Sequence, residues 1–239
     1  MKPVAYELME QWSRDHWWYR ARREILVDVF ERFVDKGSLV LDFGAGNGET
    51  GRALARNDYR VLAADPEESA LKLCHAKGLE TLNLGRERPA SETFDAILAA
   101  DVLEHVEDDL ELLRELCGCL RPSGRLVLTV PAYEFLWSGE DYVSGHLRRY
   151  TRTRLQRRVA ESGARVLWSS YFNTWLLPGI TLAILAARLF QPRRMYVSNV
   201  APAPDFANAW LYRLFRSEAR WLRRSTLPMG ASILLVAER

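Results

Sequence analysis

The stretch Leu39-Val-Leu-Asp-Phe-Gly-Ala-Gly-Asn-Gly-Glu-Thr-Gly51 decides how this sequence folds. Residues 39–43 form a short apolar run that ends abruptly in glycines, a pattern typical of a buried strand in a parallel sheet. Residues 49–57 are predicted to form a short helix directly after it. Glycines at such a junction let a ligand approach the main chain, and the helix N-terminus offers free N–H donors. The stretch therefore predicts a strand–turn–helix unit that cradles a nucleotide.

The spacing of the glycines fits two cofactors. The series Gly46-x-Gly48-x-x-Gly51 satisfies the pattern of dinucleotide-binding proteins, whereas Gly44-x-Gly46-x-Gly48 satisfies the pattern for S-adenosyl-L-methionine (SAM). Both cofactors require an acid about 20 residues further on, at the end of the next strand, to bond the ribose hydroxyls. Asp65 meets this requirement for either cofactor, so these residues leave the choice open.

Asp42, two residues before the first glycine, favours SAM. A carboxylate at the end of this strand suits a ligand that carries an ammonium group, as the methionine moiety of SAM does. The same carboxylate would repel the pyrophosphate of a dinucleotide. We therefore expect SAM rather than NAD at the glycine loop.

Composition indicates an ordinary globular protein. At 239 residues the chain is long enough for one α/β domain with a well-buried core, and 48% of its residues are hydrophobic and 27% charged. Its three cysteines, an odd number without paired spacing, argue for reduced thiols in a cytoplasmic protein. The N-terminus lacks the apolar segment of a secretory signal. The four histidines lack the spacing of metal ligands, so no metal site is predicted.

Charge is distributed unevenly along the chain. Residues 1–150 hold 19 basic and 27 acidic side chains, whereas residues 151–239 hold 14 basic and 4 acidic ones. Such asymmetry indicates that the C-terminal part meets an anionic surface, which phospholipid, a phosphate-bearing substrate or nucleic acid could each provide. A genomic preference for arginine is an alternative source, because only four of the 33 basic residues are lysine.

The strand predicted over 94–100 ends in a second informative motif, Asp101-Val-Leu-Glu-His105. Loops at the carboxyl ends of the strands are where ligands bind in open α/β sheets. His105 could act there as a base, or it could hold the shape of the pocket through hydrogen bonds.

Residues 137–150 carry many polar side chains just beyond the strand predicted over 125–131. A methyl acceptor can require a base, and His146, with an ordinary pKa of about 6.5, is the natural candidate. Arg148 and Arg149 could grip an anionic group of the substrate. The alternative is a structural loop that His–Asp and Arg–Asp pairs hold in place.

An N-terminal segment, residues 1–37, precedes the glycine loop. Apolar residues at helical spacing predict an amphipathic helix over 22–33. An aromatic and basic cluster that includes Trp17 and Tyr19 comes before this helix. These aromatic side chains either pack the helix against the sheet or form a lid over the cofactor cleft.

Residues 173–230 separate the strands predicted over 164–172 and 231–238. The first apolar run of this insert is too short to span a membrane. A proline-rich connection, 191–205, leads to an amphipathic helix over 206–224 that bears both arginines and tryptophans, which suits contact with a membrane surface. A helical cap packed on its own domain, or a dimer interface, would explain the same pattern.

The string Val40-Leu-Asp-Phe-Gly-Ala-Gly-Asn-Gly-Glu49 closely resembles the first motif of class I SAM-dependent methyltransferases. Asp101–His105 is similar to the string that ends the family's fourth strand. With "HWWYRARR" near the start and "GHLRRY" after the fifth strand, the chain looks like a bacterial, small-molecule (UbiE-like) member. The resemblance implies a Rossmann-like sheet of seven mostly parallel strands with helices on both faces. It divides one methyltransferase domain, 1–239, into an N-terminal helical segment or lid (1–37), a SAM-binding core (38–172 and 231–239) and a helical insert before the last strand (173–230).

The resemblance also implies roles for particular residues. The loop Gly44–Gly48 would hold the methionine moiety and Asp65 the ribose hydroxyls, while Ala100 and Asp101 would border the sulfonium. The cofactor-binding residues expected in this way are Asp42, Gly44, Ala45, Gly46, Gly48, Asp65, Pro66, Ala100 and Asp101. The expected acceptor-binding residues are Trp17, Tyr19, Arg148, Arg149 and Tyr150, and His146 and His105 are the catalytic candidates.

The expected reaction is in-line methyl transfer from SAM to a small-molecule, saccharide or lipid-linked acceptor, at oxygen. Nucleic acid is not expected as a partner, because no nucleic-acid module and no Asn-Pro-Pro-Tyr-type motif is present. The protein is expected in the cytoplasm, or peripherally on the inner face of a membrane through residues 173–225, as a monomer or a homodimer. Two alternatives remain: an NAD-dependent oxidoreductase, and a non-catalytic SAM-fold protein that acts at a membrane.

Overall fold

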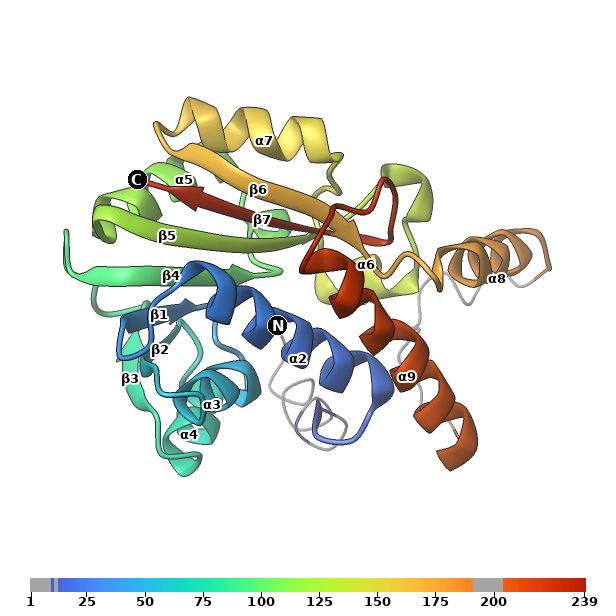
Figure 1. Ribbon diagram of the computed structural model, residues 1–239, viewed down its shortest axis with the longest axis horizontal. Coiled ribbons are helices and arrows are strands. Elements are labelled where there is room, and N and C mark those ends of the chain that lie inside the picture. Colours follow the sequence, from blue (N-terminus) through green and yellow to red (C-terminus); the bar gives the residue numbers. More distant parts are fainter. Residues whose placement is uncertain (1–9, 11–12, 191–203) are drawn as a thin grey trace.

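The computed structural model describes residues 10, 13–190 and 204–239 (Figure 1). Residues 1–9, 11–12 and 191–203 lie outside the described part, and with them most of the proline-rich connection predicted in the insert.

A seven-stranded sheet in the order β3-β2-β1-β4-β5-β7-β6 forms the centre of the molecule. Only β7 runs antiparallel, between β5 and β6. This is the Rossmann-like, mostly parallel sheet that the sequence predicts. Because the strand order reverses between β1 and β4, the carboxyl edge there is where an open α/β sheet binds its ligand. The strands are β1 (Leu39–Phe43), β2 (Arg60–Asp65), β3 (Glu80–Asn83), β4 (Phe94–Ala100), β5 (Leu120–Pro131), β6 (Arg165–Phe172) and β7 (Ser232–Glu238).

Helices cover both faces of the sheet, as predicted. The helices described are α2 (Trp17–Phe33), α3 (Glu49–Ala55), α4 (Glu68–Ala76), α5 (Asp109–Cys119), α6 (Gly139–Ser144), α7 (Arg152–Glu161), α8 (Leu177–Phe190) and α9 (Asp205–Leu222), with short 3-10 turns at Leu103–His105 and Glu134–Leu136. Side chains of α2, α3 and α9 share one buried cluster with strand residues such as Val40 and Leu98. Side chains of α5 and α7 share the other with alternate strand residues such as Leu41 and Ile97. The strands are therefore buried on both faces, as their near-continuous apolar runs require.

Helix α2 begins at Trp17, five residues before the predicted start. The imidazole of His16 accepts a hydrogen bond from the Trp18 N–H at 3.3 Å and so caps the first turn.

Helix α6 was not predicted at all. Its start is fixed by a capping box, in which the side chains of Ser138 and Asp141 each bond the other's backbone N–H.

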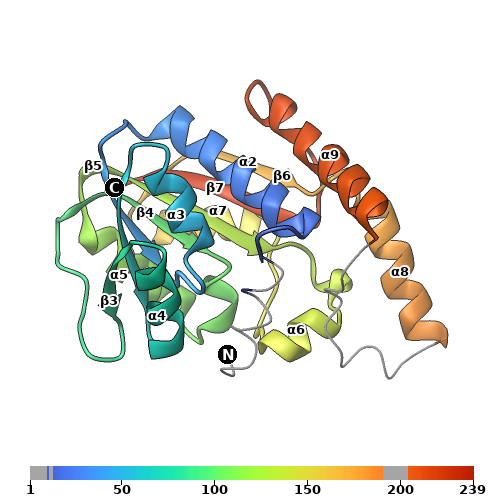
Figure 2. The same ribbon diagram turned by 90° about the horizontal axis from the view of Figure 1, so that it is seen from below.

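The two helices of the insert behave differently. Helix α9 packs beside α2 on one face of the sheet, as both views show (Figures 1 and 2). Arg216 of α9 forms ion pairs with Glu24 at 2.9 Å and with Asp28 at 2.7 Å on α2. Helix α8 instead juts from the body of the molecule, and of its side chains only Leu177 and Ile184 are buried. Across the described ranges, no helix combines the length and the apolar character needed to cross a bilayer.

Candidate cofactor and acceptor site

The glycine loop lies between β1 and α3, at the sheet edge where the strand order reverses. Gly44, Gly46 and Gly48 all adopt positive φ angles, of 74°, 56° and 76°. A Cβ on Gly44 would lie 2.7 Å from a methyl group of Val102, and one on Gly48 would lie 2.8 Å from the sulfur of Cys74. Only glycine fits these positions, because both the backbone angle and the space exclude a side chain. Ala45 continues the turn, and its N–H donates to the Ala64 carbonyl at 3.0 Å.

Asp65, at the carboxyl end of β2, fastens this loop to the second strand. One carboxylate oxygen accepts from the Gly46 N–H at 2.9 Å, and the other accepts from the Glu67 N–H at 2.9 Å. Burial raises the pKa of Asp65, while these two N–H groups lower it. Each carboxylate oxygen has a second lone pair, so Asp65 can still accept hydrogen bonds from hydroxyl groups of a ligand. Pro66 follows it and is exposed.

Asp42 is almost completely buried against the first turn of α3. A Cβ on Gly51 would lie 2.8 Å from its Oδ2 atom, which shows how closely the carboxylate approaches the helix. Burial and the neighbouring charge of Asp65 raise the pKa of Asp42 to about 7, while the Gly51 N–H lowers it. Its Oδ2 atom is buried and has no hydrogen-bond partner among the described residues.

Arg22 of α2 joins the N-terminal helix to the ends of β4 and β5. One of its terminal nitrogens donates to Asp101 at 2.7 Å and to the Thr129 hydroxyl at 2.6 Å, and Thr129 donates to Asp101 at 3.0 Å. Asp101 follows Ala100, the last residue of β4, and adopts a positive φ of 57°, which is rare for a residue with a side chain. The Nε of Arg22 is buried and has no hydrogen-bond partner among the described residues, so it can bond a polar group of a ligand.

Three further ionisable side chains meet beyond the end of β4. The ligand atoms of Glu104, His105 and His146 lie within 4.8 Å of one another. Glu104 is completely buried, and within the described part of the chain neither of its carboxylate oxygens has a hydrogen-bond partner. Burial and the charge of Asp101 raise its pKa well above the usual range, whereas burial and His146 lower the pKa of His105. These three groups could hold a metal ion, which the spacing of the histidines in the sequence did not indicate.

Asp141 is the centre of the loop that carries His146. Arg149 donates to both of its carboxylate oxygens, at 2.8 Å each, and Nδ1 of His146 lies 2.8 Å from Oδ1. The Ser138 N–H donates to Oδ2 at 2.7 Å. These bonds outweigh burial and lower the pKa of Asp141. The loop is therefore held by His–Asp and Arg–Asp pairs, which is the structural alternative left open above.

Of the expected acceptor-binding residues on this loop, two are buried and one is partly exposed. Arg149 and Tyr150 are buried and hold the loop, because Arg149 is engaged by Asp141 and the Tyr150 hydroxyl donates to Asp109 at 2.9 Å. The structure thus does not support direct contact of these two with an acceptor, and the reason is that their polar groups are already bonded inside the fold. Arg148 donates to the Glu107 carbonyl at 2.8 Å.

The two aromatic candidates of the N-terminal segment have different neighbours. Trp17 packs edge-to-face against Phe215 of α9, with ring centroids 6.1 Å apart, so it belongs to the packing of this helix. Burial and the charges of Glu140 and Asp101 raise the pKa of Tyr19 to about 12. The ring of Tyr19 packs edge-to-face against Trp18 and His16, with centroids 5.0 and 5.9 Å away, and is partly exposed, so Tyr19 remains a candidate for contact with the acceptor.

Arg22, Glu104 and Asp141 were not among the site residues expected from the sequence, although the His–Asp and Arg–Asp pairs of the structural alternative imply an aspartate in the loop that carries His146. Arg22 lies within "HWWYRARR" and Glu104 lies within the Asp101–His105 motif, so both stood inside strings already singled out. The signal for Asp141 was the Ser138-x-x-Asp141 spacing of a capping box.

Comparisons with known proteins agree with this geometry. A family model described as a methyltransferase domain matches residues 17–168. A ubiquinone biosynthesis O-methyltransferase of Parvibaculum lavamentivorans is 30% identical over 148 residues, which cover 53% of this chain and 58% of that protein. The protein of the same name from Xanthomonas campestris pv. campestris (strain B100) is 31% identical over 139 residues, covering 52% and 57%. The chain therefore spans well under two thirds of these relatives.

Solved structures with the same fold are more distant in sequence. A Haloferax volcanii methyltransferase solved in complex with the Trm112 activator superposes with a TM-score of 0.63 at 18% identity, covering 99% of this chain and 93% of that one. A SAM-dependent methyltransferase from Mesorhizobium loti superposes with a TM-score of 0.57 at 17% identity, covering 88% and 96%. At this identity the likeness extends to the fold alone.

Proposed function

This chain belongs to the methyltransferase domain family, and from that premise we propose that it transfers a methyl group from SAM to an oxygen of a small-molecule acceptor. The observation that carries the proposal is the glycine loop between β1 and α3, fastened by Asp65 at the reversal point of the sheet. The relatives named above are O-methyltransferases by name, which supports oxygen as the acceptor atom. The same family match favours methyl transfer over the oxidoreductase alternative.

The residues at this edge fit SAM. Gly44, Gly46 and Gly48 leave main-chain atoms of this loop uncovered by side chains of their own, and Asp65 retains lone pairs for the ribose hydroxyls. Arg22 has a buried, unbonded Nε that would suit the methionine carboxylate, and Asp42 beneath the loop would suit the ammonium group. When bound, SAM supplies an electrophilic methyl group on a positively charged sulfur. Asp101, which pairs with Arg22 at the end of β4, would border that sulfur.

His146 is the base that we assign to the acceptor side. Because its Nδ1 lies 2.8 Å from the Asp141 carboxylate, the proton of a neutral ring is held on Nδ1 and Nε2 keeps a free lone pair. Arg149 keeps Asp141 ionised and so fixes this tautomer. His146 would accept the proton of an acceptor hydroxyl as the oxygen attacks, and His105, whose ring centroid lies 4.8 Å away, would shape the pocket.

The acceptor classes that we propose are small molecules, saccharides and lipid-linked compounds, rather than nucleic acid.

We also propose a cytoplasmic protein, active as a monomer or homodimer, with peripheral contact to the inner face of a membrane through residues 173–225. The buried, unpaired state of Cys74, Cys117 and Cys119 is consistent with a reducing compartment.

Calorimetric titration with SAM and with NAD tests the cofactor directly, and we expect binding of SAM alone. Methyl transfer is then followed with methyl-labelled SAM against a panel of phenols, saccharides and a lipid extract, with His146→Gln as the companion variant. Preferential binding of NAD would overturn the proposal. SAM binding without transfer to any acceptor class would instead support the non-catalytic alternative.

A further inference from the structure

Helix α9 has two faces of opposite character. Its inner face buries Phe215, Ala219 and Leu222 against the body of the domain. Its outer face exposes large apolar and basic side chains at helical spacing: Phe206, Trp210, Arg213, Arg220, Trp221 and Arg224. Phe206 is 80% exposed and Trp210 is 61% exposed, although aromatic side chains of this size are usually covered. This outer face therefore carries exposed aromatic and basic side chains together along its length.

Helix α8 exposes a second apolar surface. It contains no acidic residue, and Leu182, Leu185, Leu189 and Phe190 are exposed, the last two by 74% and 80%. Apolar side chains gathered in this way mark a contact surface on a soluble domain. Arg188 donates to the carbonyl groups of Phe135 and Trp137 at 2.9 and 2.8 Å, which fastens α8 to the loop that leads to α6.

Both helices project from the end of the molecule that holds the candidate site. In both ribbon views they extend beyond the carboxyl ends of the parallel strands, on the side where β6 ends and β7 begins (Figures 1 and 2). Phe135 and Leu147, on the segments that flank α6, are also exposed. Leu147 directly follows the proposed base His146, so apolar surface borders the acceptor side of the site.

The charge of these two helices favours an anionic bilayer over a second copy of this chain as the partner. Residues 177–190 and 205–224 contain six arginines and two acids, and one of the acids, Glu218, is completely buried. Arg216 and Arg223 form ion pairs with acids of α2, so the positive charge of the exposed face comes from Arg213, Arg220 and Arg224. A second copy docked through the same face by two-fold symmetry would bring arginines against arginines. An anionic bilayer instead offers phosphate groups to the arginines and an apolar interior to the aromatic and leucine side chains, and it attracts each basic residue near its surface.

We propose that the outer faces of α8 and α9 dock this protein on an anionic phospholipid bilayer. Phe206 and Trp210 of α9 and Leu189 and Phe190 of α8 enter the interface, and the exposed arginines of α9 face the lipid phosphates. Docking brings the acceptor edge of the sheet next to the membrane, so that an acceptor anchored in the bilayer reaches His146. This second step, unlike the docking itself, rests on the proposed methyl transfer.

Vesicle flotation tests the docking without any catalytic readout. We expect the protein to float with vesicles of phosphatidylcholine containing about one third phosphatidylglycerol and to stay behind with phosphatidylcholine alone. The triple variant Arg213→Gln, Arg220→Gln, Arg224→Gln should bind about 100-fold more weakly, since each basic residue at such a surface contributes roughly fivefold. The double variant Phe206→Ser, Trp210→Ser should also weaken binding to the anionic vesicles, because it removes the two most exposed aromatic side chains of α9.

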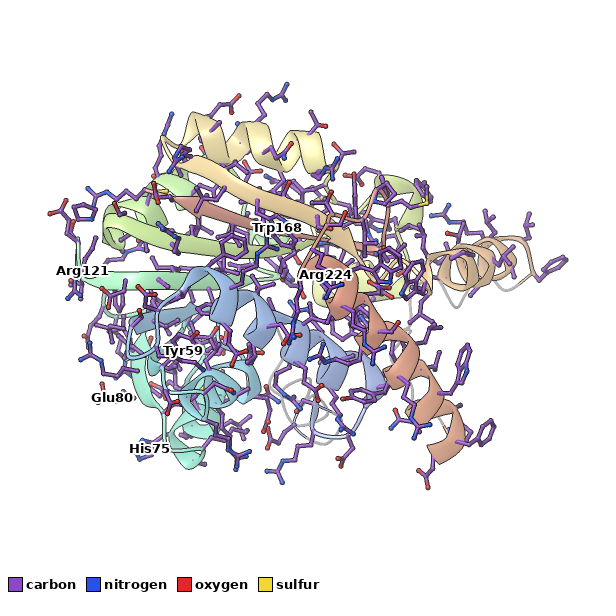
Figure 3. All side chains as sticks on the ribbon, in the orientation of Figure 1. Tyr59, His75, Glu80, Arg121, Trp168 and Arg224 are labelled. Atoms are coloured by element: carbon purple, nitrogen blue, oxygen red, sulfur yellow. The ribbon has the colours of Figure 1, made fainter. Side chains whose placement is uncertain are left out.

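The matched control removes three exposed arginines elsewhere: Arg56→Gln, Arg121→Gln, Arg157→Gln. Arg121 and Arg224 are labelled in Figure 3, where Arg121 lies at the opposite end of the molecule from α8. All substituted side chains are exposed. The control variant loses the surface ion pairs of Arg121 with Asp95 and of Arg157 with Glu161, and such pairs contribute at most about 1 kcal/mol each, so circular dichroism should show both triple variants folded. The control should float like the wild-type protein. If both triple variants lost flotation equally, net charge alone would explain the binding, and the proposed docking surface would be wrong.

Two other outcomes would also overturn it. One is flotation that does not depend on anionic lipid, and the other is a dimer that the double variant on α9 dissociates in light scattering. Calorimetric titration with SAM on the same preparations separates the two proposals. Protein that binds SAM but does not float contradicts the docking alone, and protein that floats without binding SAM contradicts the methyl transfer alone.

Discussion

The guanidinium of Arg22 lies 2.7 Å from the carboxylate of Asp101, although the two residues are 79 positions apart in the chain. The contact ties the N-terminal helix to the end of β4, next to the glycine loop. It also holds Asp101 in a backbone conformation that few residues with a side chain adopt. The N-terminal segment is thereby part of the candidate site and more than a packing element.

Replacing Arg22 by leucine should cost stability and SAM affinity together. The substitution leaves Asp101 without its charge partner, and because the Asp101 side chain is partly exposed we expect a loss of about 2 kcal/mol in unfolding free energy rather than the larger cost of a fully buried pair. Urea unfolding and calorimetric titration measure the two effects. Arg20→Gln, an exposed position on the same helix, is the control. Unchanged SAM affinity in Arg22→Leu would remove Arg22 from the site.

Replacing Asp65 by alanine should weaken SAM binding by at least about tenfold, since a hydrogen bond to a charged group contributes about 1.5–3 kcal/mol. The same change frees the Gly46 N–H and loosens the glycine loop. Calorimetric titration checks the affinity. The control is Glu80→Gln, at the amino end of β3 and so at the sheet edge opposite the glycine loop (labelled in Figure 3). This substitution should leave the affinity for SAM unchanged. Equal affinity in Asp65→Ala and the wild type would refute the ribose assignment.

The Asp141–His146 pair predicts a separation of stability from turnover. Asp141→Asn leaves Arg149 without a charge partner and should lower the unfolding free energy by about 3 kcal/mol. His146→Gln removes one hydrogen bond to Asp141 but leaves those of Arg149 and Ser138, so it should lower the unfolding free energy by only about 1 kcal/mol. It should lower kcat by about 100-fold, the usual contribution of a general base. SAM affinity should hold in His146→Gln, and full turnover in that variant would exclude His146 as the base.

Asp141 also predicts an acid limit to stability. Its pKa is lowered in the fold, so its stabilisation is present above the unfolded value of about 4 and is lost as the pH falls below it. Wild-type unfolding free energy should therefore decline on acidification, and Asp141→Asn should decline less steeply. Parallel profiles for the two proteins would contradict this assignment.

Glu218 predicts a pH effect of opposite sign. Burial raises its pKa to about 7, although the backbone N–H groups of Trp175, Thr174 and Asn173 lower it. A raised carboxyl pKa means stability that is fully present below about pH 4.5 and is lost as the pH rises through 7. Glu218→Gln should therefore be about 2 kcal/mol more stable than the wild type at pH 8 and similar to it at pH 5. Glu111→Gln, an exposed position, should show no such difference. Chemical unfolding at both pH values decides the matter, and a destabilised Glu218→Gln at pH 8 would contradict it.

Treatment with a chelator tests whether Glu104, His105 and His146 bind a metal ion or act as side chains without one. Transfer from a sulfonium is driven by positioning, so we expect turnover to survive treatment with EDTA. Loss of activity that zinc restores in the wild type but not in Glu104→Gln would instead assign a metal ion to these three side chains.

The sequence by itself determined the sheet and the glycine loop. Each depends on local pattern: short apolar runs specify buried strands, and the spacing of Gly44, Gly46 and Gly48 specifies a turn that no side chain can enter. Asp65 was found in the same way, because the end of the strand after the loop is fixed by connectivity.

Tertiary structure alone decided which polar side chains meet. Arg22 reaches Asp101 only because α2 packs across β4 and β5, and His146 meets Glu104 only because the loop after α6 folds back over the end of β4. It also decided that the polar groups of Arg149 and Tyr150 are bonded inside the fold. Distances between side chains far apart in sequence depend on packing, and burial then sets their charge. No periodicity or spacing in the chain encodes either of these.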